Sequence, residues 1–149
     1  MKNIKLQLIG LLKQGYCTPK ISSIAKKLGT PSTTVHYNIK SMEKEGMVKG
    51  YKAVFDYKRI GEGFCTFVLI SLDSAEYKDP GKMALELAKY EQVESVDIIT
   101  GGWELIIKVR TQGIEEYYEF SKRVLSLKGI VKTQSLNSLM EVKTEFVNV

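Results

Sequence analysis

The stretch ISSIAKKLGTPSTTVHYNIKSMEKEGMV, residues 21–48, decides the fold of the N-terminal part of the chain. It consists of two short amphipathic segments separated by a Gly-Thr-Pro break. Gly29 can end the first segment as a helix because glycine adopts the left-handed conformation easily, and the Ser32 hydroxyl can cap the next helix. Apolar residues of the first segment recur at spacings of three and four, on one face of a helix: Ile21, Ile24, Ala25 and Leu28.

The second segment combines an apolar stripe with a polar, basic face. Val35, Ile39 and Met42 form the stripe. The opposite face contains no acidic residue and offers groups that can contact phosphates or base edges. This layout is typical of a helix-turn-helix whose second helix enters the major groove of DNA. The residues expected to contact DNA are Ser32, Thr33, Thr34, His36, Tyr37, Lys40 and Lys44.

The expected contacts differ with the chemistry of the side chain. The two lysines should contact phosphate or guanine edges, and the hydroxyl groups at the helix N-terminus should contact phosphate. His36 and Tyr37 are the candidates for base discrimination. Since one recognition helix offers few contacts, a dimer that binds two half-sites is expected.

The distribution of charge favours DNA binding over a plain surface helix pair. Residues 1–50 contain nine Lys and only two acids, Glu43 and Glu45. Residues 51–149 contain ten Lys, three Arg and fifteen acids. A basic N-terminal third joined to a mildly acidic remainder indicates that this end of the chain meets a polyanion. Double-stranded DNA is therefore the expected partner.

The charge step also favours two domains within the 149 residues. We place a helix-turn-helix DNA-binding domain at residues 1–50, a linker strand and hinge at 51–63, and a second domain at 64–149. No apolar run approaches the roughly 18 residues of a membrane span, and the N-terminus lacks a signal-peptide pattern. A cytoplasmic protein with no membrane partner is expected.

Sequence on either side of the helix pair completes the first domain. An amphipathic helix ending near Gly15 should form a three-helix core with the pair, and Gly46 should cap the recognition helix. Residues 49–57 should be extended, as a wing or a connecting strand, and residues 58–63 should be a hinge. The apolar positions of the first helix are Ile4, Leu8, Leu11 and Leu12.

The second domain shows an order of elements rather than a motif. Strands rich in β-branched and aromatic residues alternate with amphipathic helices, and the Gly101-Gly102 turn joins two strands into a hairpin. The order β-α-β-β-α-β predicts an α+β fold with a ferredoxin-like sandwich. The expected strands are 64–72, 93–100, 103–111 and a stretch from 130 onward that 136–139 interrupts, and the expected helices are 80–90 and 114–127.

The first strand of this domain is apolar on both faces. In a ferredoxin-like sandwich both helices cover one face, so the face carrying Cys65, Phe67 and Leu69 needs another cover. A second copy of the chain would supply it, which favours a homodimer. The alternative is cover in cis by residues 49–57 or by the C-terminal tail.

The residue inventory excludes several chemistries. His36 is the only histidine, so no Ser-His-Asp or Cys-His arrangement is present. No Cys/His cluster has zinc spacing, and no glycine loop for phosphates occurs, so neither a metal nor a cofactor is expected. Cys17 and Cys65 lack a partner motif and should be reduced thiols, with a disulfide between them as the alternative.

Taken together, these features resemble the Lrp/AsnC family of transcription regulators over essentially the whole chain. The segments IAKKLGTPSTTVHYNIKSMEKEGMVKGY (24–51) and TGGWELIIKVRT (100–111) carry the resemblance. The second resembles the family's Gly-x-x-Asp turn, with Glu104 in the acidic position. The family's Leu-Asp-x-x-Asp opening is missing here, and Tyr37, Asn38 and Ser41 stand where Arg is frequent. These differences bear on the operator sequence more than on the function.

The resemblance implies an amino-acid effector bound in the second domain, between subunits of neighbouring dimers. It also implies homodimers that assemble into higher even oligomers, with an octamer as one such assembly. Glycine N–H groups can bind a ligand carboxylate, and a nearby acid can pair with its ammonium. The alternative for the turn is a simple hairpin with a core Trp. The implied site residues are Gly101, Gly102, Trp103, Glu104, Thr133 and Ser135.

Two other functions remain open at this stage. Siroheme decarboxylases resemble this family in fold, but they use histidine at a tetrapyrrole, and the lone His36 lies on the DNA-facing helix. A ligand-sensing or assembly module with a silent helix-turn-helix is the other alternative. The excess of Lys over Arg, 19 against 3, favours an archaeal source.

Overall fold

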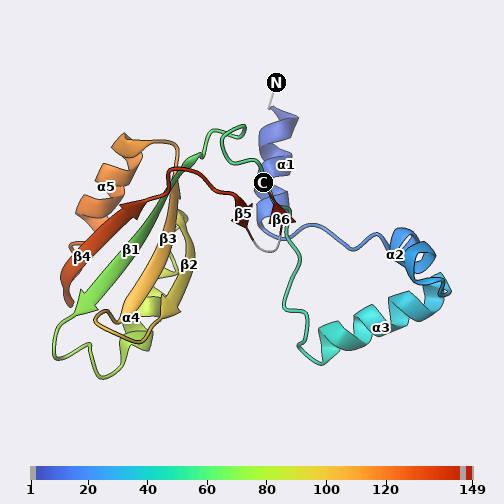
Figure 1. Ribbon diagram of the computed structural model, residues 1–149, viewed down its shortest axis with the longest axis horizontal. Helices are drawn as coiled ribbons and strands as arrows, with labels where there is room; N and C mark the ends of the chain where they lie inside the picture. The colour runs from blue at the N-terminus through green and yellow to red at the C-terminus, as the bar shows by residue number, and fades with distance from the viewer. Residues whose placement is uncertain (1–2, 145–146, 149) are drawn as a thin grey trace. The chain divides into compact units, whose positions relative to one another are not determined.

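The computed structural model describes residues 3–144 and 147–148. The chain divides into two compact units, Met1–Val54 and Phe55–Val149 (Figure 1). The break between them lies inside the stretch 51–63 that the sequence assigns to the linker. No helix in the described part of the chain is long and apolar enough to cross a membrane.

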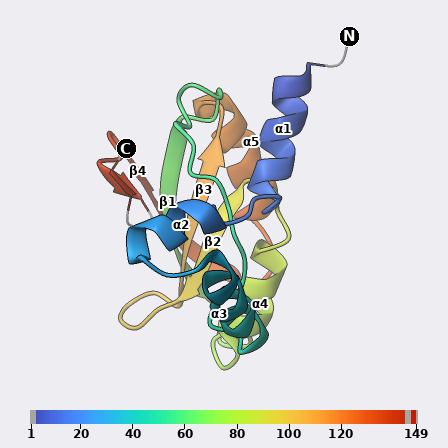
Figure 2. The same cartoon turned by 90° about the vertical axis from the view of Figure 1, so that its right-hand side faces the viewer.

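The N-terminal unit contains α1 (Ile4–Lys13), α2 (Ile21–Leu28) and α3 (Ser32–Lys44), and a short turn joins α2 to α3 (Figure 2). Gly29 ends α2 in the left-handed conformation, with φ of 61°, as predicted. The capping role predicted for Ser32 is wrong. Pro31 is the N-cap residue and no side chain caps α3. Because Pro31 is extended, with φ of −56° and ψ of 141°, Ser32 becomes the first helical residue.

The predicted three-helix core is also wrong in this chain. Ala25 of α2 and Val35 of α3 are the buried residues of the helix pair, whereas no residue of α1 is buried. The apolar stripe of α1 is solvent-exposed: Ile4, Leu8 and Leu11 are 62%, 49% and 44% exposed. The turn between α2 and α3 is three residues long, but seven residues including Pro19 separate α1 from α2. The periodicity of α1 therefore predicted a helix but not its packing partner.

The end of the recognition helix follows the prediction and the linker does not. Gly46 has φ of +74° and follows the C-cap residue Glu45, so the chain leaves α3 through a glycine turn. Residues 48–56 belong to no helix or strand, so the predicted connecting strand does not form in this segment. A strand requires a neighbouring strand for its hydrogen bonds, which local sequence cannot supply.

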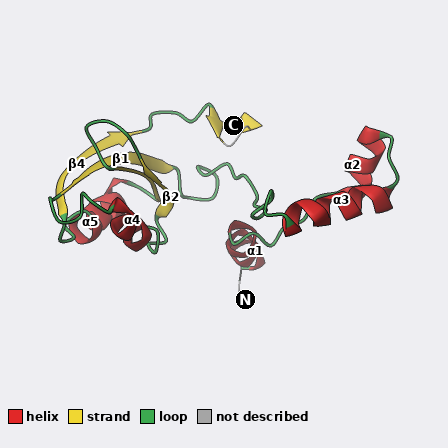
Figure 3. Cartoon of the chain, turned by 90° about the horizontal axis from the view of Figure 1, so that it is seen from below, coloured by secondary structure: helices red, strands yellow, loops and turns green. Residues whose placement is uncertain are grey.

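The second unit contains a four-stranded antiparallel sheet in the order β2-β3-β1-β4, with α4 and α5 on one face (Figure 3). This is the predicted βαββαβ arrangement. After the sheet come two strands of two residues each that the sequence did not predict, β5 (Lys143–Thr144) and β6 (Val147–Asn148), and they pair in antiparallel fashion. The main elements are β1 (Phe64–Leu72), α4 (Pro80–Leu87), β2 (Val93–Ile98), β3 (Leu105–Thr111), α5 (Ile114–Val124) and β4 (Ile130–Asn137).

The core lies between the sheet and the two helices. Alternate residues of β1 and β3 point into it, and Val68, Ile70 and Ile107 are fully buried there. Leu87 of α4 and Phe120 of α5 cover them from the helix side. The alternation leaves the other residues of each strand on the opposite face, which the helices do not cover. Cys17 and Cys65 are free thiols, so they form no disulfide.

Candidate DNA interface and effector site

The residues predicted to contact DNA lie together on the exposed surface of α3. Each of the seven is solvent-exposed, and Tyr37 reaches 74%. The burial of Val35 against α2 turns the opposite side of the helix, with Thr33, Tyr37 and Lys44, outward. A 13-residue helix with this exposed polar face has the dimensions needed to enter a major groove. His36 is on its flank.

One of the residues predicted to contact DNA, Lys40, already forms an ion pair within the protein. The Lys40 ammonium forms an ion pair with Glu43 at 2.7 Å, and the Tyr51 hydroxyl donates to the other carboxylate oxygen at 2.9 Å. The hydrogen bond from Lys40 lowers the pKa of Glu43, and Glu43 in turn raises the pKa of Lys40. The spacing of three residues on a helix is the signal that predicts such a pair.

The predicted effector turn joins β2 to β3 and is tied to the end of β1. Gly101 has φ of +114°, which a glycine adopts without strain. The Glu104 N–H donates to the Ile70 carbonyl at 3.1 Å, and the Glu104 carboxylate accepts from the Leu72 N–H at 2.8 Å. Trp103 lies against Lys132 of β4, with the ammonium 5.2 Å from the ring centroid. Glu104 therefore also holds the irregular end of β1.

The two predicted residues of β4 stand in different positions relative to this turn. Thr133 pairs with Ile70, which pairs on its other side with Leu105, so Thr133 shares a row of the sheet with the end of the turn. Ser135 lies two rows away and forms a short hydrogen bond with the hydroxyl of Tyr117 on α5. The structure thus brings Thr133 to the turn and uses the Ser135 hydroxyl within the sandwich.

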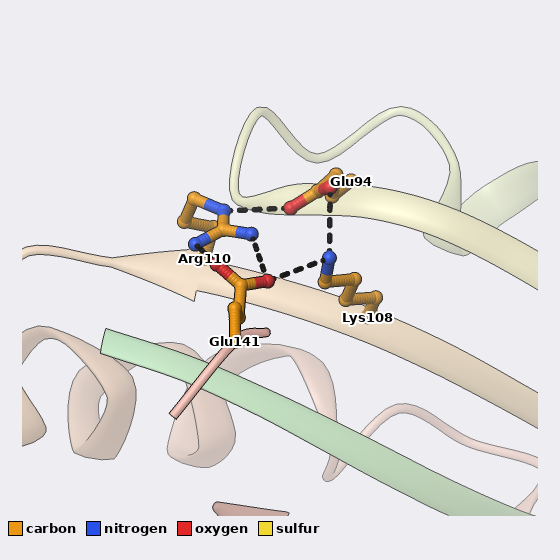
Figure 4. A network of polar contacts seen from close by, with 4 residues as sticks. All are labelled: Glu94, Lys108, Arg110 and Glu141. Carbon is orange, nitrogen blue, oxygen red and sulfur yellow. Dashed lines mark hydrogen bonds and ion pairs between the residues drawn. The ribbon is translucent and has the colours of Figure 1, made fainter. Parts of the chain in front are cut away.

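A cluster of four charged residues lies on the sheet face that the helices leave open. Lys108 and Arg110 of β3 each contact both Glu94 of β2 and Glu141, which follows β4 (Figure 4). The contacts range from 2.6 to 3.1 Å, and Arg110 binds Glu141 through two nitrogens. The Arg110 side chain is only 5% exposed. Two cations and two anions thus neutralise one another at a partly buried site.

The pKa values of the cluster shift toward the charged forms. The hydrogen bond from Arg110 lowers the pKa of Glu141 to about 2. Burial raises the pKa of Glu94, but the bonds to Arg110 and Lys108 outweigh it and the net shift is downward. Burial lowers the pKa of Lys108, but Glu141 and Glu94 outweigh it and the net shift is upward. All these groups are therefore charged near neutral pH.

This cluster covers part of the sheet face that the helices leave open. The Tyr57 ring stacks on the Arg110 guanidinium, 3.6 Å from the ring centroid, and Glu141 closes the cluster from the chain segment after β4. Cys65 beneath them is 3% exposed, and burial raises the pKa of its thiol. The cis cover considered from the sequence therefore exists over this part of the face. Elsewhere on it, Leu136 is 46% exposed.

Comparisons with known proteins agree with this architecture. A model of the Lrp/AsnC ligand-binding domain matches residues 65–147, and a model of a winged helix-turn-helix DNA-binding domain matches residues 3–49. The chain is 33% identical over 126 residues to an uncharacterized HTH-type transcriptional regulator of Pyrococcus furiosus, a match that covers 84% of each protein. This relative agrees with the archaeal character predicted from the lysine excess.

Solved structures of low sequence identity share the fold. The structure of E. coli AsnC has a TM-score of 0.73 at 22% identity, and the match covers 99% of this chain and 97% of that one. A transcriptional regulator from Neisseria meningitidis, solved as a complex with L-Met, has a TM-score of 0.75 at 21% identity, covering 92% and 88%. The chain therefore belongs to the Lrp/AsnC family, and it is a transcription regulator with a DNA-binding helix-turn-helix, not an enzyme.

Proposed function

We propose that this regulator binds specific DNA sequences as a homodimer or a larger even oligomer, and that a small amino acid controls it. The exposed, basic outer face of α3 is the observation that supports DNA binding. His36 and Tyr37 read bases, Lys40 and Lys44 contact phosphate or guanine edges, and the hydroxyl groups of Ser32, Thr33 and Thr34 contact phosphate near the helix N-terminus.

A dimer is proposed because two half-sites give operator-level affinity that one helix does not. The exposed apolar residues of α1 and the exposed Leu136 support it, since apolar surface of this kind favours contact with another chain. Half-sites should lie about one helical turn apart, or a multiple of it. Light scattering at micromolar concentration tests the assembly, and a monomer would contradict it. Sequencing of genomic fragments captured by the purified protein then gives the half-site and its spacing.

The proposed effector site is the turn Gly101–Glu104 together with Thr133 and, two rows away, Ser135. The L-Met complex of the Neisseria meningitidis regulator supports an amino acid as the ligand class. Gly102 suits a close ligand approach, because a Cβ built there meets no atom within 4 Å. A ligand changes the assembly only if it prefers one assembly over the other, and a site between subunits meets this condition.

Thermal-shift screening of the twenty amino acids tests the effector proposal. Any amino acid that raises the Tm is then measured with Gly102→Trp, which fills the space over the turn, and with Glu104→Gln. The glutamine keeps an acceptor for the Leu72 N–H but removes the charge that would pair with the ligand ammonium. Both variants should lose the shift while retaining the wild-type fold by circular dichroism. A full shift in both variants, or no stabilising amino acid, would contradict the site.

A further inference from the structure

The end of the turn between β2 and β3 and a lysine of β4 lie on either side of one residue of β1. The Glu104 N–H and carboxylate bind the β1 main chain before and after Ser71, at 3.1 and 2.8 Å. Lys132 of β4 pairs with Ser71 from the other side. Because Ile70 is buried in the core, the alternation of β1 places Ser71 on the face that the helices leave open, and its pair partner Lys132 shares that face.

Lys132 contacts an aromatic ring instead of an acid. Its ammonium lies 5.2 Å from the centroid of the Trp103 ring. Lys132 is exposed, and it forms no ion pair with an acid in the part of the chain that the structure describes. The face of an aromatic ring attracts a cation without neutralising it. Since an ammonium has three N–H donors, Lys132 can stay on the ring and still donate to a ligand carboxylate.

A second lysine of the same face shows the contrast. Lys108 contacts both Glu94 and Glu141 and is 13% exposed, so its charge is already compensated within the protein. The charge of Lys132 is not. Glu104 also keeps a free acceptor, because only its Oε2 accepts the main-chain hydrogen bond and its Oε1 bonds to no described residue. An acid and a base on one face, unpaired with each other, are therefore open to a ligand.

The spacing of the two charges limits the ligand. Neighbouring strands lie about 4.8 Å apart, so two strand spacings, or roughly 10 Å, separate the main chains of Glu104 and Lys132. A ligand that meets both residues needs an ammonium at one end and a carboxylate at the other. A neutral side chain would leave Lys132 without a partner, and a basic side chain would be repelled by it.

We propose that the effector is an acidic amino acid, glutamate or aspartate, and that Lys132 selects it by binding the side-chain carboxylate. Glu104 binds the ligand ammonium, the N–H groups of Gly101 and Gly102 bind its α-carboxylate, and Trp103 holds the Lys132 ammonium in place. The proposal names the ligand class of the effector site and rests on the proposed function.

Calorimetric titration with glutamate and with glutamine tests the selection, because the two ligands differ in the charge of the side chain and hardly in its size. Hydrogen bonds to charged groups contribute enough that the wild-type protein should bind glutamate about tenfold to a hundredfold more tightly than glutamine. Lys132→Gln should reduce this preference to less than about threefold. The position is exposed on an edge strand, so the variant should keep the wild-type circular dichroism.

Matched variants separate a contact from bulk charge. Lys132→Arg keeps the charge and should keep the preference for glutamate. Lys82→Gln removes an exposed lysine of α4 and should also keep it. If the wild-type protein binds glutamine as tightly as glutamate, or if Lys132→Gln retains the full preference, the proposal is overturned.

Three further outcomes distinguish the ligand class from the function on which it rests. If a neutral or basic amino acid binds more tightly than glutamate and aspartate, and Gly102→Trp abolishes its binding, the effector site stands and the acidic class is overturned. If none of the twenty amino acids binds, the effector function itself is removed and the acidic class with it. Glutarate has two carboxylates and no ammonium, so binding of glutarate as tight as that of glutamate would overturn the role of Glu104 and the assignment to an amino acid.

Discussion

The same kinds of charged side chain have opposite surroundings in the two units of this chain. In the N-terminal unit the lysines of α2 are exposed, and no described acid pairs with them. In the second unit Lys108 and Arg110 are 13% and 5% exposed, and each contacts two carboxylates. Charge in the first unit is available to a partner, whereas charge in the cluster is used to hold strands and the segment after β4 together.

The physical reason is the cost of removing a charge from water. An exposed lysine stays hydrated and contributes little to folding, so evolution can place many of one sign on a surface that binds DNA. A buried charge costs several kcal/mol unless partners compensate it, so removal of one partner leaves the others uncompensated. We therefore expect mutations of the cluster to affect stability and mutations of the helix-turn-helix to affect DNA binding.

The largest expected effect is the loss of Arg110. Arg110→Met leaves Glu94 and Glu141 with Lys108 as their one cation and should lower the free energy of unfolding by about 3–5 kcal/mol. Urea unfolding at fixed protein concentration measures this loss. Arg59→Met is the control, because the Arg59 side chain is 87% exposed in its ion pair with Asp56 and should cost at most about 1 kcal/mol. Equal losses in the two variants would contradict the contrast between buried and exposed charge.

The next effect is a loss of stability in acid that depends on Glu141. Its folded pKa is about 2 and its ordinary value is 4.5, so the folded state binds this proton less readily than the unfolded state. The resulting stability is present above about pH 4.5 and is lost as the pH falls toward 2, with a size of roughly 3 kcal/mol. Unfolding by urea between pH 7 and pH 2.5 should show a flatter dependence in Glu141→Gln, which is also less stable at pH 7. If the free energy of unfolding falls equally with pH in the wild-type protein and in Glu141→Gln, the result would argue against the ion pairs of Glu141.

A smaller effect is expected on base discrimination. Tyr37→Ala should reduce the preference for the specific site over random duplex by about 1–2 kcal/mol, without loss of stability, because Tyr37 is 74% exposed. His36→Ala should act in the same direction. Tyr77→Ala is the matched control, since it removes a tyrosine that is 62% exposed in the other unit. Competition binding measures the ratio of the affinities for the specific duplex and the random duplex. If this ratio is unchanged in both Tyr37→Ala and His36→Ala, other residues read the bases.

The smallest expected effect is that of one unpaired lysine on α3. Lys44→Ala should weaken binding to every sequence by a similar factor and reduce the salt slope by about one unit. Lys82→Ala in the other unit is the control of equal charge and should leave the slope as it is. Fluorescence anisotropy at several salt concentrations measures both. A change in sequence preference with Lys44→Ala would mean that this residue reads bases.

Most of the architecture could be predicted because it depends on local patterns. The period of apolar residues predicted α2, α3 and β1, and β1 begins and ends at the predicted residues, Phe64 and Leu72. The Gly101-Gly102 pair predicted the hairpin of β2 and β3. Periodicity shows which face of a segment is apolar, and glycine shows where the backbone turns, so both can be read without knowing the neighbours.

Contacts between residues that are far apart in the sequence could be identified only from the tertiary structure. Glu94 and Glu141 are separated by 47 positions in the sequence, and only the pairing of β2 with β3 and the path after β4 bring them to the same two cations. The stripe of α1 predicted a helix, yet a packing partner cannot be inferred from the helix's own residues. The sequence by itself determined the fold and the basic face of α3. The tertiary structure decided which charges are compensated and which stay available, because desolvation and pairing depend on what lies within a few ångströms in space.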